Sequence, residues 1–227
     1  MRVLVACEVS GRVRDAFLTA GADAVSCDLL PSEQLGPHII GDVLDQVGQG
    51  WDVMIAFPPC THLSSSGARW WAEKRADGRQ QAAIEFVMAL ATAPIPRIAI
   101  ENPIGVLSTA WRKPDQVIQP WQFGHDASKA TCLWLRGLPP LTPTRHVEPH
   151  YACSCGCRFE GALGKYGCPS CEGDGGAARR VWANQTPTGQ NRLGPSPTRA
   201  ADRARTYMGI AKAMAEQWSI LQSKEGE

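Results

Sequence analysis

The sequence predicts an α/β fold, a doubly wound and mostly parallel sheet with a small separate insert. In the first half of the chain, short apolar runs of strand type alternate with segments of helical spacing, which is the pattern of βαβ units. Five of the nine cysteines then fall between residues 153 and 171, in a glycine-rich segment without apolar periodicity. We therefore expect a main domain formed by residues 1–145 and 176–227, interrupted by an insert at residues 146–175.

Composition narrows the class of protein. Hydrophobic residues make up 44% of the 227 residues, which is enough for a packed core. The net charge is +1, so a nucleic-acid surface would have to come from local clustering of basic residues. No run of about eighteen apolar residues occurs, and we expect no membrane span. The odd number of cysteines argues against a secreted disulfide framework and favours a reducing, cytoplasmic compartment.

The chain opens with a strand, a turn and a helix. Residues 3–6 form an apolar run, residues 7–11 a turn of mostly small side chains, and residues 12–18 have helical spacing. In a nucleotide-binding sheet the turn and the helix N-terminus of this unit can face a polar ligand. A second strand, residues 22–27, ends at Asp28, where an acid can accept hydrogen bonds from ribose hydroxyls. On its position alone, Asp28 is as easily an ordinary surface acid.

A strand over residues 51–57 ends in Pro58-Pro59-Cys60. Two prolines remove two backbone donors and fix φ, so the chain must leave the sheet there. A cysteine held at the C-terminal end of a strand is where an α/β fold places a nucleophile. A buried structural cysteine is the alternative.

The next strand carries a second candidate catalytic residue, Glu101. Residues 61–77 read as a long loop with paired tryptophans, either a lid or a segment packed on the core. A helix over residues 80–92 follows, and then a strand over residues 97–103 that contains Glu101. Parallel strands end at one edge of a sheet, so Cys60 and Glu101 should meet there. A thiolate and a carboxylic acid facing a heterocycle suggest covalent catalysis by conjugate addition.

The second half of the chain is less regular. Residues 104–124 read as irregular and residues 127–135 as a strand in which Lys129 and Thr131 alternate with apolar side chains. Residues 137–149 read as a proline-rich linker. Residues 198–221 have the spacing of a single final helix.

Three short motifs carry a resemblance to a known family. Pro59-Cys60, the Ser64 and Gly67 that follow it, and Glu101-Asn102 resemble the cytosine-C5 DNA methyltransferases. Sequences of that family read Pro-Cys-Gln, then Phe-Ser and Gly, then Glu-Asn-Val. The chain is most similar to short phage-borne members, over residues 1–136 and 198–221.

The resemblance implies a Rossmann-like methyltransferase fold and a reaction. Cys60 would attack C6 of cytosine, Glu101 would contact N3 and the exocyclic amine, and S-adenosylmethionine would supply a methyl group to C5 in DNA. Lys129 and Thr131 would stand on the strand that contacts the base in the family, there marked by Gln-x-Arg-x-Arg. The cofactor-binding residues would be Ala6, Cys7, Glu8, Ser10, Gly11, Asp28, Asp42 and Pro58. The family's Phe-x-Gly-x-Gly is absent, because residues 6–11 read Ala-Cys-Glu-Val-Ser-Gly.

The cysteine cluster predicts a structural zinc ribbon. Two cysteine knuckles about ten residues apart can supply a closed tetrahedral site. The favoured ligands are Cys153, Cys155, Cys168 and Cys171, with Cys157 or His150 as the main rival. The ribbon would either only stabilise the insert or help to bind DNA phosphates through Arg158, Lys165, Arg179 and Arg180.

Two other functions stay open at this point. The same chemistry could act on free dCMP or transfer another one-carbon group. The chain could also be a non-catalytic zinc-ribbon DNA-binding protein on a methyltransferase scaffold. The presence of both Cys60 and Glu101 argues against the last alternative, since a binding module needs neither.

Overall fold

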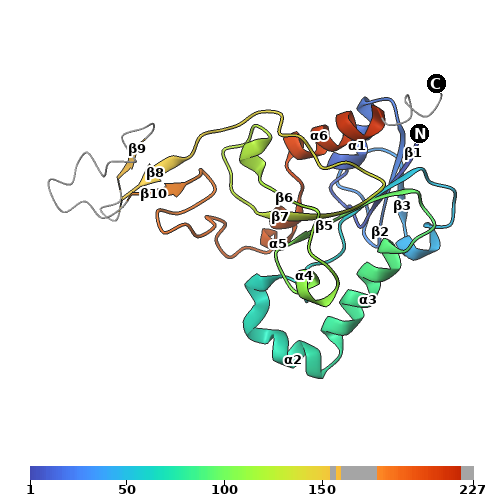
Figure 1. Cartoon of the computed structure of the whole chain (residues 1–227), viewed down its shortest axis with the longest axis horizontal. Coiled ribbons are helices and arrows are strands. Elements are labelled where there is room, and N and C mark those ends of the chain that lie inside the picture. Colours follow the sequence, from blue (N-terminus) through green and yellow to red (C-terminus); the bar gives the residue numbers. More distant parts are fainter. Residues whose placement is uncertain (154–156, 160–177, 221–227) are drawn as a thin grey trace. The chain divides into compact units, whose positions relative to one another are not determined.

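A computed structural model describes residues 1–153, 157–159 and 178–220 (Figure 1). The chain divides into two compact units. Unit 1 comprises Met1–Ile118, Ala130–Thr142 and Ile210–Glu227, and unit 2 comprises Gln119–Lys129 and Pro143–Gly209.

Unit 1 contains a seven-stranded sheet of order β3-β2-β1-β4-β5-β7-β6. The first five of these strands are parallel, and β7 runs antiparallel to both of its neighbours. This is the doubly wound, mostly parallel, Rossmann-like sheet that the sequence predicts. The strands are β1 Arg2–Ala6, β2 Asp23–Asp28, β3 His38–Ile40, β4 Val53–Ala56, β5 Arg97–Pro103, β6 Gln116–Ile118 and β7 Thr131–Arg136.

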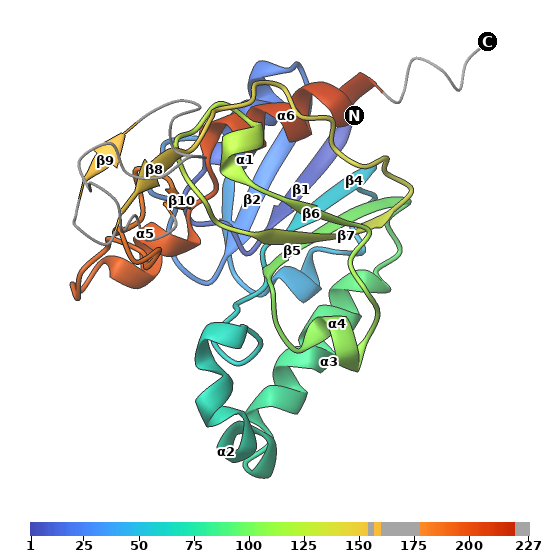
Figure 2. The same ribbon diagram turned by 60° about the vertical axis from the view of Figure 1, so that its left-hand side comes forward.

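Helices cover both faces of this sheet. Helix α3 (Arg79–Ala91) places Val87 and Leu90 in one buried cluster with side chains of β1, β4, β5 and β7. Figures 1 and 2 place α1 (Arg12–Thr19) and α6 (Met208–Ser219) on the opposite face. Because both faces are buried, the central strands are continuous apolar runs without alternation.

Unit 2 contains a small antiparallel sheet of order β10-β8-β9. Its strands are β8 His150–Ala152, β9 Arg158–Phe159 and β10 Arg179–Val181. A 3-10 helix, η3, spans Pro120–Gln122, and α5 spans Arg199–Ala204.

The predicted insert, residues 146–175, is smaller than unit 2, which also contains residues 119–129 and runs from 143 to 209. Strand β10 pairs with β8, so the segment after the insert belongs to the same unit as the insert. The amide group of Asn184 bonds both backbone groups of Ser128, at 3.0 and 2.9 Å, which ties residues 119–129 to that unit as well. These pairings join residues far apart in sequence, so composition could not reveal them.

Three local expectations were wrong. Residues 61–77 are not only a loop, since they hold the 3-10 helix η2 (Ser65–Trp70) and α2 (Trp71–Ala76). The irregular region contains α4 (Leu107–Ala110) and β6. The final helix is two helices, because Arg205 is extended (φ −57°, ψ 133°) between α5 and α6. The chain then passes so close to Phe123 that a Cβ at Gly209 would lie 1.9 Å from its carbonyl oxygen.

The predicted metal ligands are only partly within the described residues. Cys155, Cys168 and Cys171 lie outside them. Cys153 is buried, and its backbone N–H donates to the carbonyl of Cys157 at 3.1 Å. No group of three or more metal-ligating side chains occurs in the described part of the chain. None of the helices described there is long and apolar enough to span a bilayer.

Candidate active site

The predicted catalytic segment leaves the sheet at its topological switch point. Strands β1 and β4 are neighbours at the centre of the sheet, although β2 and β3 lie between them in sequence. The register pairs Ala6 with Ala56, and Phe57 N–H donates to the Ala6 carbonyl at 2.9 Å. In open α/β sheets, ligands bind outside the carboxyl ends of strands at such a point.

Cys60 lies on a tight turn that we call the Cys60 turn, residues 58–64. The Cys60 carbonyl accepts hydrogen bonds from the N–H groups of Leu63 and Ser64, at 3.0 and 2.9 Å. The Cys60 side chain is exposed, and therefore the structural-cysteine alternative does not describe it.

Strand β5 holds this turn. Asn102 is 1% exposed, and its Nδ2 donates to the Pro58 carbonyl at 2.9 Å. The Asn102 Oδ1 is buried and has no hydrogen-bond partner among the described residues. A buried acceptor of this kind needs a water or a ligand donor.

The loop after β5 makes a second attachment. Val106 N–H donates to the Leu63 carbonyl, and Ser65 N–H donates to the Ile104 carbonyl, both at 2.9 Å. A Cβ at Gly105 would lie 2.0 Å from the Leu63 oxygen, so only glycine fits there. Sequence reasoning did not single out Gly105.

Glu101 extends from the neighbouring strand. Ala56 pairs with Ile100, so Glu101 is the next residue towards the edge where Cys60 lies. Glu101 pairs with Leu133, and Pro103 pairs with Thr131. Since side chains alternate along strands, Glu101 and Thr131 share one face of the sheet. Burial, and then the charge of Glu101, raise the pKa of the adjacent Cys132.

Lys129 is not part of that strand. It precedes β7, belongs to unit 2, and donates its backbone N–H to Gln119 Oε1 at 2.9 Å. The structure thus brings Glu101 and Thr131 together in unit 1, with Cys60 at the end of the adjacent strand.

The predicted cofactor loop has an unusual backbone at Cys7. Its φ of 58° makes it the one non-glycine residue in the left-handed region among the described residues. Burial, and then the charges of Asp28, Cys27 and Asp42, together raise the pKa of Cys7 to about 12. Because their charges act on Cys7, the two candidate cofactor acids, Asp28 and Asp42, lie near this loop.

Glu8 closes the start of helix α1. Its carboxylate accepts hydrogen bonds from the N–H groups of Val13 (2.8 Å) and Arg14 (3.2 Å) and from the Ser10 hydroxyl (3.0 Å). Burial raises the pKa of Glu8, and these hydrogen bonds oppose the rise. The N–H groups expected to face a ligand are therefore occupied by the chain's own carboxylate.

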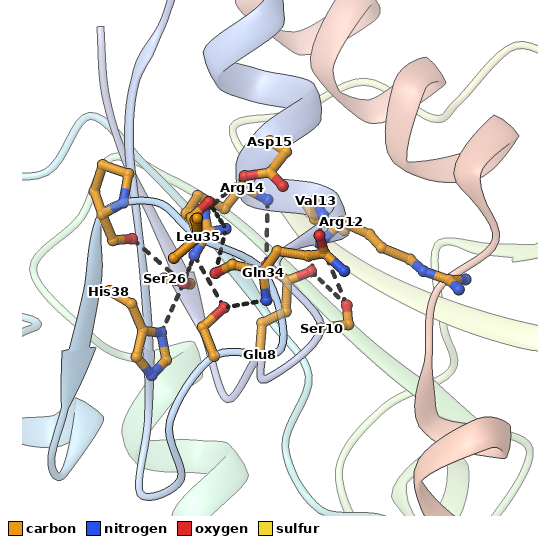
Figure 3. A network of polar contacts seen from close by, with 12 residues as sticks. Glu8, Ser10, Arg12, Val13, Arg14, Asp15, Ser26, Gln34, Leu35 and His38 are labelled. Atoms are coloured by element: carbon orange, nitrogen blue, oxygen red, sulfur yellow. Dashed lines mark hydrogen bonds and ion pairs between the residues drawn. The ribbon is translucent and has the colours of Figure 1, made fainter.

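Arg14 is a functional candidate that sequence reasoning missed. Its guanidinium is fully buried and donates to the hydroxyls of Ser26 and Ser32 and to the carbonyls of Gln34 and Leu35, at 3.1–3.3 Å (Figure 3). It also pairs with Asp15 at 2.8 Å. Arg14 thereby fixes the loop after β2 over the start of α1. Its place on the helix beside apolar residues was the only signal.

The two acids expected to bind the cofactor follow β2 and β3. Asp28 Oδ1 accepts the N–H of Leu30 at 3.0 Å, and Asp42 Oδ1 accepts the N–H of Leu44 at 2.9 Å. The apolar side chains of Leu29, Leu30 and Ile40 are exposed beside them. Acids next to exposed apolar surface suit a nucleoside, with polar contacts to the sugar and apolar contacts to the base.

No protein-family model and no curated protein matches the chain. A search of solved structures finds a prophage-encoded protein of E. coli that is assigned, by inference, as a DNA modification methyltransferase. The TM-score is 0.43 at 14% identity, over 75% of this chain. The match covers 56% of that protein, so the chain spans little more than half of its length.

Proposed function

We propose that this chain is a DNA methyltransferase that transfers a methyl group from S-adenosylmethionine to C5 of cytosine. The observation that carries the proposal is the exposed Cys60, held on a turn by Asn102 and Gly105 of the segment that also carries Glu101. A binding module would need neither the cysteine nor this support.

The chain's own groups account for activation of the base. The Cys60 thiolate forms a bond to C6, and the electron pair displaced from the ring is accepted at N3, where protonated Glu101 donates its hydrogen. C5 thereby becomes nucleophilic. S-adenosylmethionine supplies the methyl group that C5 takes up. The N3 proton returns to Glu101. Loss of the C5 proton to a water molecule, with departure of the Cys60 thiolate from C6, then restores the aromatic ring.

Residues at the ends of β1, β2 and β3 fit the cofactor. The acids Asp28 and Asp42 lie close enough to the half-buried Cys7 to raise its pKa, and exposed apolar side chains adjoin them. We assign the ribose to Asp28, the adenine to Asp42, and the remaining contacts to the loop from Ala6 to Gly11 and to Pro58. Glu8 contributes by closing α1, since its carboxylate is committed there.

Unit 2 supports DNA as the substrate. Its sequence has ten lysines and arginines against six acids, whereas unit 1 has thirteen against sixteen. A net positive charge in only one of the two units favours phosphate binding there, despite the near-neutral total for the chain. We assign Lys129, Arg158, Arg179 and Arg180 to DNA contacts.

We assign a structural zinc ion to Cys153, Cys155, Cys168 and Cys171. The described part of this set is compatible, since Cys153 is buried at the end of β8, beside Cys157. The rival His150 binds Asp126 through Nε2 at 2.6 Å, so it could bind a metal only through Nδ1.

Covalent trapping tests the proposal. The protein is incubated with tritiated S-adenosylmethionine in three parallel reactions. One contains a DNA duplex with 5-fluorocytosine, the second contains the same DNA without fluorine, and the third contains dCMP. We expect a protein–DNA adduct with the fluorinated duplex that Cys60→Ala abolishes. Labelled dCMP with unlabelled DNA would instead support the nucleotide alternative. Lack of cofactor binding by calorimetry would leave the non-catalytic alternative.

A further inference from the structure

A buried lysine contacts the Cys60 turn. Lys74, on α2, is 8% exposed, and it is the one buried lysine among the described residues. Its Nζ donates to the carbonyl of Thr61 at 2.6 Å, directly after Cys60. A Cβ at Gly67 would lie 3.4 Å from Nζ, so the ammonium sits inside the segment that follows Cys60.

This ammonium has no acidic partner. The ion pairs of its own segment join Arg79 to Glu73 and Asp77, and Lys74 takes part in no ion pair with any described residue. A buried charge is costly unless a nearby group compensates for it. Burial also removes Lys74 from contact with DNA phosphates, for which the exposed Arg69 and Arg75 are available.

A neutral side chain, that of Gln80, makes the same kind of hydrogen bond to the next carbonyl group, that of His62. Gln80 is 2% exposed, and its Nε2 donates to the His62 carbonyl at 3.1 Å. Lys74 and Gln80 together hold two successive carbonyls after Cys60. Only Lys74 adds a positive charge. Substitutions of Lys74 and of Gln80 can therefore distinguish the effect of holding the turn from the effect of the charge.

We propose that Lys74 is a positioning residue for Cys60, which fixes the turn through Thr61 and stabilises the Cys60 thiolate by its charge. A cation beside a cysteine favours the thiolate, which is the nucleophilic form. The inference rests on the proposed function only in taking Cys60 as the nucleophile.

Alkylation of the free protein tests this role without DNA or cofactor. The rate of iodoacetamide addition at Cys60 is followed by mass spectrometry of its peptide, between about pH 6 and pH 9. For Lys74→Met we expect a rate about tenfold lower at pH 7 and a pH profile moved about one unit upwards. Lys74→Arg should stay near the wild-type rate. A Lys74→Met profile that coincides with the wild type would overturn the proposal.

Two further variants keep the test sharp. Gln80→Leu removes the neighbouring bond without changing charge, so its profile should keep the wild-type midpoint. If it moves as far as that of Lys74→Met, charge is not the cause. Lys74→Gln keeps a donor towards Thr61 and replaces Lys74→Met if thermal unfolding shows that variant to be misfolded. Methyl transfer that survives in Cys60→Ala would contradict the proposed function instead, whatever Lys74 does.

Discussion

Two loops leave the centre of the sheet side by side, and each carries a cysteine in a different setting. The loop after β4 exposes Cys60 and is held by side chains from other elements, namely Asn102, Lys74 and Gln80. The loop after β1 half-buries Cys7 and is closed by its own Glu8. The residue type is the same in both loops. The two cysteines differ in their exposure and in the charges near them.

The largest expected difference is in thiol reactivity. The pKa of Cys7 is raised to about 12, so about one molecule in ten thousand carries its thiolate at pH 8. An ordinary exposed thiol is partly ionised there. Iodoacetamide should therefore modify Cys60 about a thousandfold faster than Cys7, as measured by mass spectrometry of the two peptides. Similar modification rates for Cys60 and Cys7 at pH 8 would show that the two thiols do not differ in ionisation and exposure.

The support of the Cys60 turn can be removed from β5. Asn102→Ala deletes the hydrogen bond to Pro58 and should slow covalent trapping of 5-fluorocytosine DNA by about 10- to 100-fold, since small displacements of a nucleophile are costly. The free energy of unfolding should fall by only about 1–3 kcal/mol. Trapping at the wild-type rate in a folded Asn102→Ala protein would contradict the positioning role.

Burial of Glu8 in the other loop makes its contribution to stability depend on pH. The folded state raises the pKa of Glu8, so it binds a proton more readily than the unfolded chain does. This contribution to stability is present at low pH and is lost as the pH rises above the ordinary glutamate range.

Urea denaturation across that range checks the effect with Glu8→Gln. The difference between the unfolding free energies of wild type and variant should become less favourable to the wild type as the pH rises. Glu8→Ala removes the cap altogether and should cost about 1–2 kcal/mol. A pH-independent difference between wild type and Glu8→Gln would show that Glu8 does not titrate differently on folding.

The smallest effect concerns the backbone at Cys7. A non-glycine residue with φ of 58° is strained, so Cys7→Gly should raise the free energy of unfolding by about 1 kcal/mol. Cys27→Gly, in the adjacent strand, is the matched control and should lower it, because a strand position gains nothing from glycine. Equal effects of the two changes would show that strain at Cys7 is negligible.

The position of the candidate site followed from local sequence features. Alternating strands and helices predicted the parallel sheet, and Pro58-Pro59 marked the end of β4 ahead of Cys60. Glu101 could be placed beside Cys60 because parallel strands end at one edge. These features depend only on residues close together in sequence, because hydrophobic periodicity and the fixed φ of proline are local properties.

The sequence by itself thus determined the α/β class, the strand that carries Cys60 and the strand that carries Glu101. Only the tertiary structure showed that Asn102, Gly105 and Lys74 hold the Cys60 turn, that Arg14 anchors the loop after β2, and that residues 119–129 join unit 2. The physical reason is sequence separation. Asn102 lies 44 residues from Pro58, and a contact of that range depends on how strands and loops pack.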